Sequence, residues 1–187
     1  MNVSKKLSTK WRKMGKSGTK WRIFSYFYLF KADAMATFIG DYTCRVDSKG
    51  RVMLPSAFKK QMPAAAMDRF VVKKDIFENC LVLFPMDEWD RQNEIIRSRI
   101  NPYNKEHSRF LRGFYKGTAE VVLDASNRLL IPRRLLETAG IGGEAVLAGQ
   151  DGKIELWSSE LYNEQAEPAH DFSQLAEKLL GDPDRNL

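Results

Sequence analysis

The chain has 187 residues, of which 30 are Lys or Arg and 24 are Asp or Glu, giving a formal net charge of +6 at pH 7. The first 34 residues alone hold nine basic side chains and one acidic side chain, so the remaining 153 residues carry a net charge of −2. The overall basicity therefore does not identify the folded part as a polyanion binder, and any contact with nucleic acid must depend on the local placement of charge.

Residues 1–35 form a basic extension. Lys and Arg, with Gly, Ser and Thr, fill residues 4–22, and an apolar run rich in aromatic residues follows at 23–30. A basic, an apolar and a small-residue region in this order formally match a secretory signal peptide. The apolar run has only eight residues, however, whereas a membrane span needs about 18 or more. We favour a disordered arm, or an over-long gene model with Met35 as the natural start, and keep a signal peptide as the alternative.

A short pattern occurs twice, 77 positions apart: residues 46–55 read VDSKGRVMLP and residues 123–132 read LDASNRLLIP. In both copies an Asp side chain can start a turn. The residue before the Arg is Gly50 or Asn127, the two types that best tolerate the positive φ of a hairpin loop. A short strand stopped by proline follows, and then a short helix, for which Ser56 is the expected cap in the first copy and Gly140 the expected stop in the second. The pattern predicts a tandem duplication of a small domain.

The duplication continues beyond this pattern. Residues 80–84 align with residues 153–157 at an offset of 73, so the second copy has lost four residues in between. Each copy therefore predicts a strand, a hairpin, a second strand, a short helix, two further strands and an amphipathic helix. The apolar strands of both halves suggest that the halves complete each other, since about 75 residues are few for an independent core.

Two helices are expected between the copies, at residues 86–100 and at about residues 105–116. The second helix carries a basic stripe at i, i+3 and i+7, formed by Arg109, Arg112 and Lys116. Such a stripe offers secondary contacts to phosphates, but a solvated helix face is the better interpretation because most charged stripes have no partner.

The sequence offers no catalytic constellation. The Gly-rich residues 140–143 follow a helix and lack the Lys-Ser or Lys-Thr of a phosphate-binding loop, and no nucleophile elbow is present. Asp47 and Asp124 each have an Arg four residues on, which favours an ionised carboxylate over a shared proton. We therefore expect that the chain is not an enzyme.

Cysteine and histidine usage points away from a metal or a disulfide framework. Cys44 and Cys80 fall within apolar strand patterns, as expected of free thiols in a reducing compartment. His107 and His170 have no Cys or His nearby at ligand spacing. We expect neither a metal nor a cofactor.

Several motifs together carry a resemblance over residues 36–165. FIGDY at 38–42 leads into DSKGR at 47–51, LVLFP follows at 81–85, the second Asp-x-x-x-Arg is at 124–128, and IELW is at 154–157. This combination resembles the MraZ family. The resemblance implies an α+β fold, mainly β, in which a tandem pair of swapped-hairpin, SpoVT/AbrB-like half-barrels forms a pseudo-twofold barrel, with amphipathic helices between and after the halves.

The resemblance also implies a domain organisation. The first SpoVT/AbrB-like domain with its helical connector would occupy residues 36–117 and the second domain residues 118–165. Residues 166–187 would form a C-terminal helical tail. The extension at 1–35 and the tail after residue 165 are both departures from the family pattern, so neither inherits a function from it.

The function implied is that of a bacterial transcriptional regulator. It would bind repeated sites in double-stranded DNA upstream of the division and cell-wall gene cluster, as a ring of several subunits in the cytoplasm at the nucleoid, without a membrane or a small-molecule substrate. The DNA contacts would come from Arg51 and Arg128 at the hairpin tips, oriented by Asp47 and Asp124, with Lys49 beside the first Arg. The second copy has Ser in place of Lys49, so the first motif is expected to bind DNA more strongly.

Two other interpretations stay open. An Asp-Arg pair across a turn can serve only to pin its hairpin, because turn residues of this type have local structural uses. The barrel can also be a protein-interaction module, antitoxin-like in its partners, whose main role is assembly.

Overall fold

The computed structural model describes residues 36–62, 68–164 and 169–181. The expectations for the extension at 1–35 therefore lie outside the described residues. In chain order the elements are β1 (Asp41–Arg45), β2 (Arg51–Met53), α3 (Ser56–Gln61), β3 (Arg69–Lys74), β4 (Leu81–Pro85), α4 (Met86–Arg99), α5 (Lys105–Tyr115), β5 (Ala119–Val122), β6 (Arg128–Leu130), α6 (Arg133–Thr138), β7 (Glu144–Gln150), β8 (Lys153–Ser158), α7 (Ser159–Glu164) and α8 (Ala169–Leu180).

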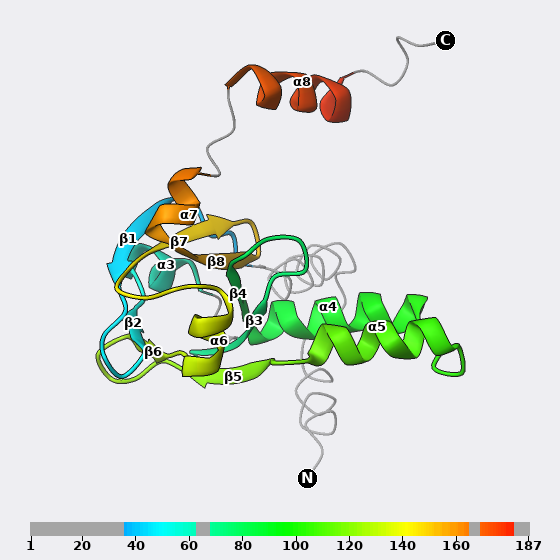
Figure 1. Cartoon of the computed structure of the whole chain (residues 1–187), viewed down its shortest axis with the longest axis horizontal. Helices are drawn as coiled ribbons and strands as arrows, with labels where there is room; N and C mark the ends of the chain where they lie inside the picture. Colours follow the sequence, from blue (N-terminus) through cyan, green and yellow to red (C-terminus); the bar gives the residue numbers. More distant parts are fainter. Residues whose placement is uncertain (1–35, 63–67, 165–168, 182–187) are drawn as a thin grey trace, which may run out of the picture. The chain divides into compact units, whose positions relative to one another are not determined.

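The strands form two antiparallel sheets (Figure 1). The larger sheet has six strands in the order β1-β7-β8-β4-β3-β5, and β2 pairs with β6 in a separate two-stranded sheet, which we call the ribbon. The first strand of each copy pairs with the third strand of the other copy, because β1 lies beside β7 and β5 beside β3. The expectation of an α+β fold built mainly from antiparallel strands is confirmed.

The strand registers follow the duplication. In the ribbon, Arg51 lies opposite Leu130, and the pair at equivalent positions, Met53 with Arg128, is also formed. The same exchange relates the β4–β8 pairs, since Leu81 lies opposite Leu156 and their equivalents pair in the same way. In both strand pairs, a cross-copy pair of residues is thus formed again at the equivalent positions of the two halves.

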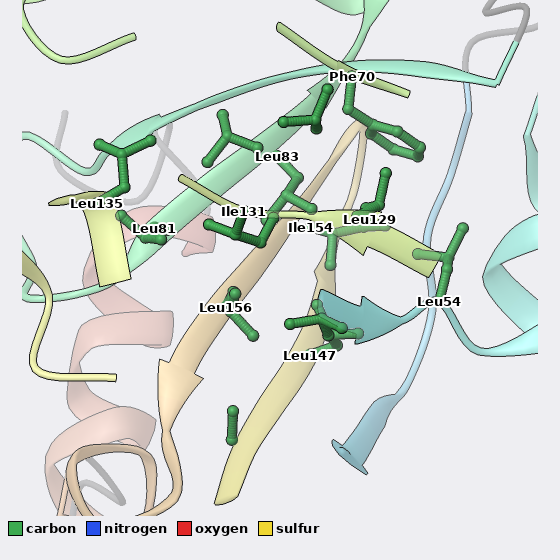
Figure 2. Close-up of a cluster of buried hydrophobic side chains, with 14 of the residues drawn as sticks. Leu54, Phe70, Leu81, Leu83, Leu129, Ile131, Leu135, Leu147, Ile154 and Leu156 are labelled. Carbon is green, nitrogen blue, oxygen red and sulfur yellow. The ribbon is translucent and has the colours of Figure 1, made fainter. Parts of the chain in front are cut away.

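Most of the buried apolar side chains, from both copies, form one core (Figure 2). Its fully buried members come from the strands and short helices of both halves and include Phe38, Phe58, Phe70, Leu81, Leu83, Leu129, Ile131, Leu147, Ile154 and Leu156. Burying a side chain of this size stabilises the fold by about 1.5–3 kcal/mol. Because the core takes residues from both halves, each half buries apolar surface of the other.

The first short helix begins differently from the expectation. The helix α3 begins at Ser56, the residue that precedes it is Pro55, and no side chain caps it. The expected capping role of Ser56 is therefore wrong. The equivalent helix α6 is likewise preceded by Pro132 and ends before Gly140, whose φ of +65° allows the chain to turn away. Proline suits this place because its fixed φ directs the chain into a helix without needing a donor.

The helices between the copies pack through aromatic side chains. Trp89 of α4 stacks on Phe114 of α5, with ring centroids 5.7 Å apart, and α4 and α5 run alongside each other (Figure 1). The Tyr115 hydroxyl donates to Asn93 Oδ1 at 2.5 Å. Asn104 caps α5 by accepting hydrogen bonds from the backbone N–H groups of Glu106 and His107. Across the described ranges, we find no helix with the length and apolar character needed to cross a membrane.

Candidate nucleic-acid interface

The first hairpin tip is organised by Asp47. Its Oδ1 accepts hydrogen bonds from the backbone N–H groups of Lys49 and Arg51, both at 2.9 Å. Its Oδ2 accepts from Arg51 Nε at 2.6 Å and also lies 2.6 Å from Arg51 Nη2. One carboxylate thus closes the turn through the backbone and holds the guanidinium group through its side chain.

The second tip repeats this geometry. Asp124 Oδ1 accepts from the backbone N–H groups of Ser126, at 2.8 Å, and Arg128, at 2.9 Å. Its Oδ2 lies 2.8 Å from both Nε and Nη2 of Arg128. The two motifs predicted from the sequence are therefore structurally equivalent, and each Asp binds the Arg of its own tip.

Positive φ angles at the position before each Arg close the two loops. Gly50 has a φ of +82° and Asn127 a φ of +55°. Gly50 also fits a close approach, because a Cβ there would lie 2.8 Å from the carbonyl oxygen of Ile131. Asn is among the residues that tolerate the left-handed region best. These residues were predicted to occupy positions of this kind.

Each tip is also bound to the strand that follows the other tip. Ile131 N donates to Gly50 O at 2.9 Å, and Leu54 N donates to Asn127 O at 2.9 Å. These reciprocal bonds fix the two tips relative to each other. A displacement of one tip would break a hydrogen bond that the other half provides.

Both arginines lie on the outer face of the ribbon. Val52 and Leu129, the middle residues of β2 and β6, are 1% exposed and belong to the core. Side chains alternate along a strand, so Arg51 and Arg128 share the opposite face. They are diagonal neighbours in this register, which places the two residues roughly 7–8 Å apart. Their side chains are 31% and 33% exposed, so neither arginine is buried in the core.

The carboxylates at the tips are held ionised. The backbone N–H of Arg51, followed by its guanidinium group, lowers the pKa of Asp47 to about 2. The side-chain hydrogen bond from Arg128, followed by that residue's backbone N–H, lowers the pKa of Asp124. At neutral pH each tip is an ion pair, so the two Asp residues do not share a proton as catalytic dyads do.

The ion pair leaves part of each guanidinium group available. Within the described residues, Nη1 of Arg51 and Nη1 of Arg128 make no hydrogen bond. Asp47 and Asp124 engage the Nε–Nη2 edge, whereas the Nη1–Nη2 edge can still donate two parallel hydrogen bonds to a phosphate or a guanine. An aspartate that holds the opposite edge also limits the rotamers of the Arg before it binds a ligand.

The secondary candidates lie elsewhere in the fold. Arg109 and Arg112 are exposed on α5, and Lys116 is exposed directly after its last residue. Two of them, Arg109 and Lys116, line a groove of about 860 Å³ that no ribbon residue lines. The structure thus brings together the five residues of the hairpin motifs and does not bring the α5 stripe into that group.

Two apolar residues of the ribbon face were missed by the sequence analysis. Met53 is 59% exposed and Leu130 is 57% exposed, and they lie opposite the two arginines in the register. The sequence feature that could have identified them is the alternation of side chains along the two strands. It directs the residues on either side of Val52 and Leu129 outward. The candidate interface is therefore a mixed face of two arginines and two apolar side chains.

The fold and the site define a duplicated α+β protein that displays a pair of Asp-bound arginines on one face of a two-stranded ribbon. A family described as "MraZ protein, putative antitoxin-like" matches the chain twice, at residues 37–113 and 114–182. The chain belongs to the MraZ family.

The relatives carry one name. The chain is 41% identical over 154 residues to the Transcriptional regulator MraZ of Christiangramia forsetii, covering 80% of this chain and 97% of the relative. It is 35% identical to the protein of that name from Bacteroides thetaiotaomicron, covering 81% and 97%. The relative from Clostridium tetani is 35% identical, covering 76% and 96%. The recognition made from the motifs is confirmed, and these relatives are named as transcriptional regulators.

Proposed function

We propose that this protein is a transcriptional regulator that binds double-stranded DNA through the outer face of the ribbon. The observation that carries the proposal is the pair of arginines, Arg51 and Arg128, fixed on one face by their own aspartates and by reciprocal hydrogen bonds between the tips. Arg forks pair with phosphates or with the edge of guanine, and a prepared fork loses less entropy on binding.

The two tips differ in charge. Each Asp neutralises its own Arg, so Lys49 supplies net positive charge at the first tip, and Ser126 has no charge at the second. We expect the first tip to bind phosphate more strongly. Asp47 and Asp124 act as positioning residues in this proposal, because they reach the DNA only through the arginines they hold.

The proposal includes assembly. A face with few contacts per subunit binds tightly only when several subunits engage repeated sites together. We therefore propose a ring of subunits that binds repeats upstream of the division and cell-wall gene cluster, at the nucleoid of the cytoplasm. The exchange of first strands, β1 onto β7 and β5 onto β3, supports two swapped-hairpin half-barrels at residues 36–117 and 118–165.

The test is a titration of the chain into labelled DNA from upstream of its own operon, read by fluorescence anisotropy. Arg51→Ala should weaken binding far more than Arg109→Ala, a matched removal of an exposed Arg from α5. Binding should also weaken with salt, with a log-log slope of about −0.9 per phosphate contacted. Equal losses in the two variants would reject the ribbon as the DNA face and favour the α5 stripe.

A second function is favoured by one observation. Met53 and Leu130 are more than half exposed between the arginines, and apolar side chains add nothing to a phosphate contact. They suit a protein partner, as in an antitoxin-like interaction module. If Met53→Ser and Leu130→Ser leave DNA binding intact while abolishing co-purification of a protein partner, the ribbon serves protein interaction.

A further inference from the structure

The two apolar side chains on the outer face of the ribbon have no role in a phosphate contact. Met53 and Leu130 hold equivalent positions in the two copies, each two residues after its Arg. They are 59% and 57% exposed. Single exposed apolar residues are common on protein surfaces, but these two recur at the same place in both copies, whereas the neighbouring Lys49 and Ser126 differ. The recurrence indicates a contact that both halves make.

The backbone holds these two side chains firmly. The residues on both sides of each are at most 2% exposed and belong to the core. These buried neighbours are Val52, Leu54, Leu129 and Ile131. The two that follow the ribbon strands, Leu54 and Ile131, also donate their backbone N–H groups to the opposite hairpin tip at 2.9 Å. Met53 and Leu130 therefore project outward from a backbone that is anchored before and after them.

The register places each apolar side chain directly across from an arginine. Arg51 lies opposite Leu130, and Met53 lies opposite Arg128. Residues in direct opposition have Cβ atoms roughly 4.5–5.5 Å apart. The face thus has a guanidinium group at two diagonal corners and an apolar side chain at the other two. A ligand that accepts hydrogen bonds from one arginine also meets the apolar side chain beside it.

The major groove of DNA offers both kinds of surface. It is about 12 Å wide and admits a two-stranded ribbon, and its floor presents the O6 and N7 acceptors of guanine and the C5-methyl group of thymine. The minor groove presents acceptors and one donor but no methyl group. Phosphates likewise offer only acceptors. A face that combines arginine forks with apolar side chains therefore matches the major groove better than the minor groove or the phosphate backbone.

A protein partner matches this face less well. A stable protein interface buries about 800 Å² on each partner, and its centre is apolar and poor in charged groups. Here the two apolar side chains alternate with Arg51 and Arg128, each of which is paired with its own Asp. Covering the face with protein would desolvate both ion pairs, which is costly. On DNA, by contrast, each apolar side chain needs only one methyl group.

We propose that Met53 and Leu130 contact thymine methyl groups in the major groove and so help to determine which DNA sequence is bound. The proposal rests on the proposed function and deepens it, because the arginines supply most of the affinity and the apolar pair supplies discrimination. Burial of one methyl group strengthens binding about fourfold, so two such contacts give about sixteenfold.

The test compares two duplexes of one sequence, taken from upstream of the chain's own operon. One contains thymine and the other contains deoxyuridine in its place, which removes only the C5-methyl group. Fluorescence anisotropy gives the affinity of wild type, of Met53→Ala with Leu130→Ala, and of a control, Ile76→Ala, which shortens a side chain that is 56% exposed outside the ribbon. Any effect of deoxyuridine on the shape of the duplex acts on all three proteins alike.

The ratio of the two affinities is the readout. Wild type and Ile76→Ala should bind the thymine duplex about sixteenfold more tightly, and each single ribbon variant about fourfold more tightly. The double variant should bind both duplexes equally. Because the substituted side chains are exposed, the variants should unfold in urea like wild type.

Three outcomes would overturn the proposal. A wild-type chain without a preference for thymine, or a double variant that keeps the wild-type preference, would reject the methyl contacts and leave DNA binding through the arginines standing. A wild-type chain that binds neither duplex would reject the proposed function as well. If the double variant keeps wild-type affinity for both duplexes but loses a co-purifying protein, the apolar pair serves protein interaction instead.

Discussion

Replacing Gly50 by Ala tests how tightly the ribbon is constrained. The native φ of +82° lies in the left-handed region, where a non-glycine residue costs about 1–2 kcal/mol. The new Cβ would also lie 2.8 Å from Ile131 O, and crowding of this kind costs typically about 1–3 kcal/mol. The two effects together should lower the free energy of unfolding by about 2–5 kcal/mol. For a chain of this size, such a loss lowers Tm on the order of 10 °C.

Alanine variants of two other glycines separate the cost of the positive φ from the cost of crowding. Gly140 has a φ of +65° but open space around its Cβ position, so Gly140→Ala should show the backbone cost alone, about 1–2 kcal/mol. Gly142 has open space and no positive φ, so Gly142→Ala should be neutral or stabilise by about 0.4–1 kcal/mol. Urea unfolding followed by circular dichroism measures all three. If Gly50→Ala cost no more than Gly140→Ala, the close approach of Gly50 to Ile131 would be refuted.

Three further predictions follow from the site and the core. Arg51→Lys keeps the positive charge but loses the guanidinium fork held by Asp47, so DNA affinity should fall nearly as far as in Arg51→Ala. Full affinity of this variant in an anisotropy titration would mean that only the charge matters. The pKa of Asp47 is lowered to about 2 in the folded chain, against about 3.9 in the unfolded chain, so its ionised carboxylate stabilises the fold at pH values above about 3.9. The difference in the free energy of unfolding between wild type and Asp47→Asn should therefore be full at pH 5 and shrink as the pH falls toward 2. A difference that stays constant over this range would contradict the prediction. Burial raises the pKa of the Cys80 thiol to about 12, so a thiol reagent at pH 8 should label Cys80 only after denaturation. Rapid labelling of Cys80 in the native chain would contradict its burial.

The hairpin tips could be predicted because their determinants are local. Asp47, Gly50 and Arg51 fall within five residues, and a side chain that binds its own turn acts the same way in almost any surroundings. The repetition of this pattern at Asp124 and Arg128 strengthened the prediction. The closeness of the two tips could not be predicted, because it depends on the pairing of β2 with β6.

Other features depend on contacts between residues far apart in sequence. Lys73 follows the apolar residues of β3 and precedes a second lysine, yet it is buried, and Phe114 of α5 lies against its ammonium group. The exchange of β1 and β5 between the copies also has no local signal. Ser56 failed as a cap because Pro55 already directs the chain into the helix at that point. Local rules thus locate turns and helices, whereas burial of a polar group is decided by the packing of distant elements.

The reciprocal hydrogen bonds between the tips resemble those of a symmetric dimer whose two subunits have been fused into one polypeptide. Fusion frees the two copies from identity, and they have since diverged at Lys49 and Ser126. A homodimer presents two identical ends to its target, whereas the two tips of this chain differ in charge. For the DNA binding proposed above, this difference predicts a preference for direct repeats, which have a direction along the double helix.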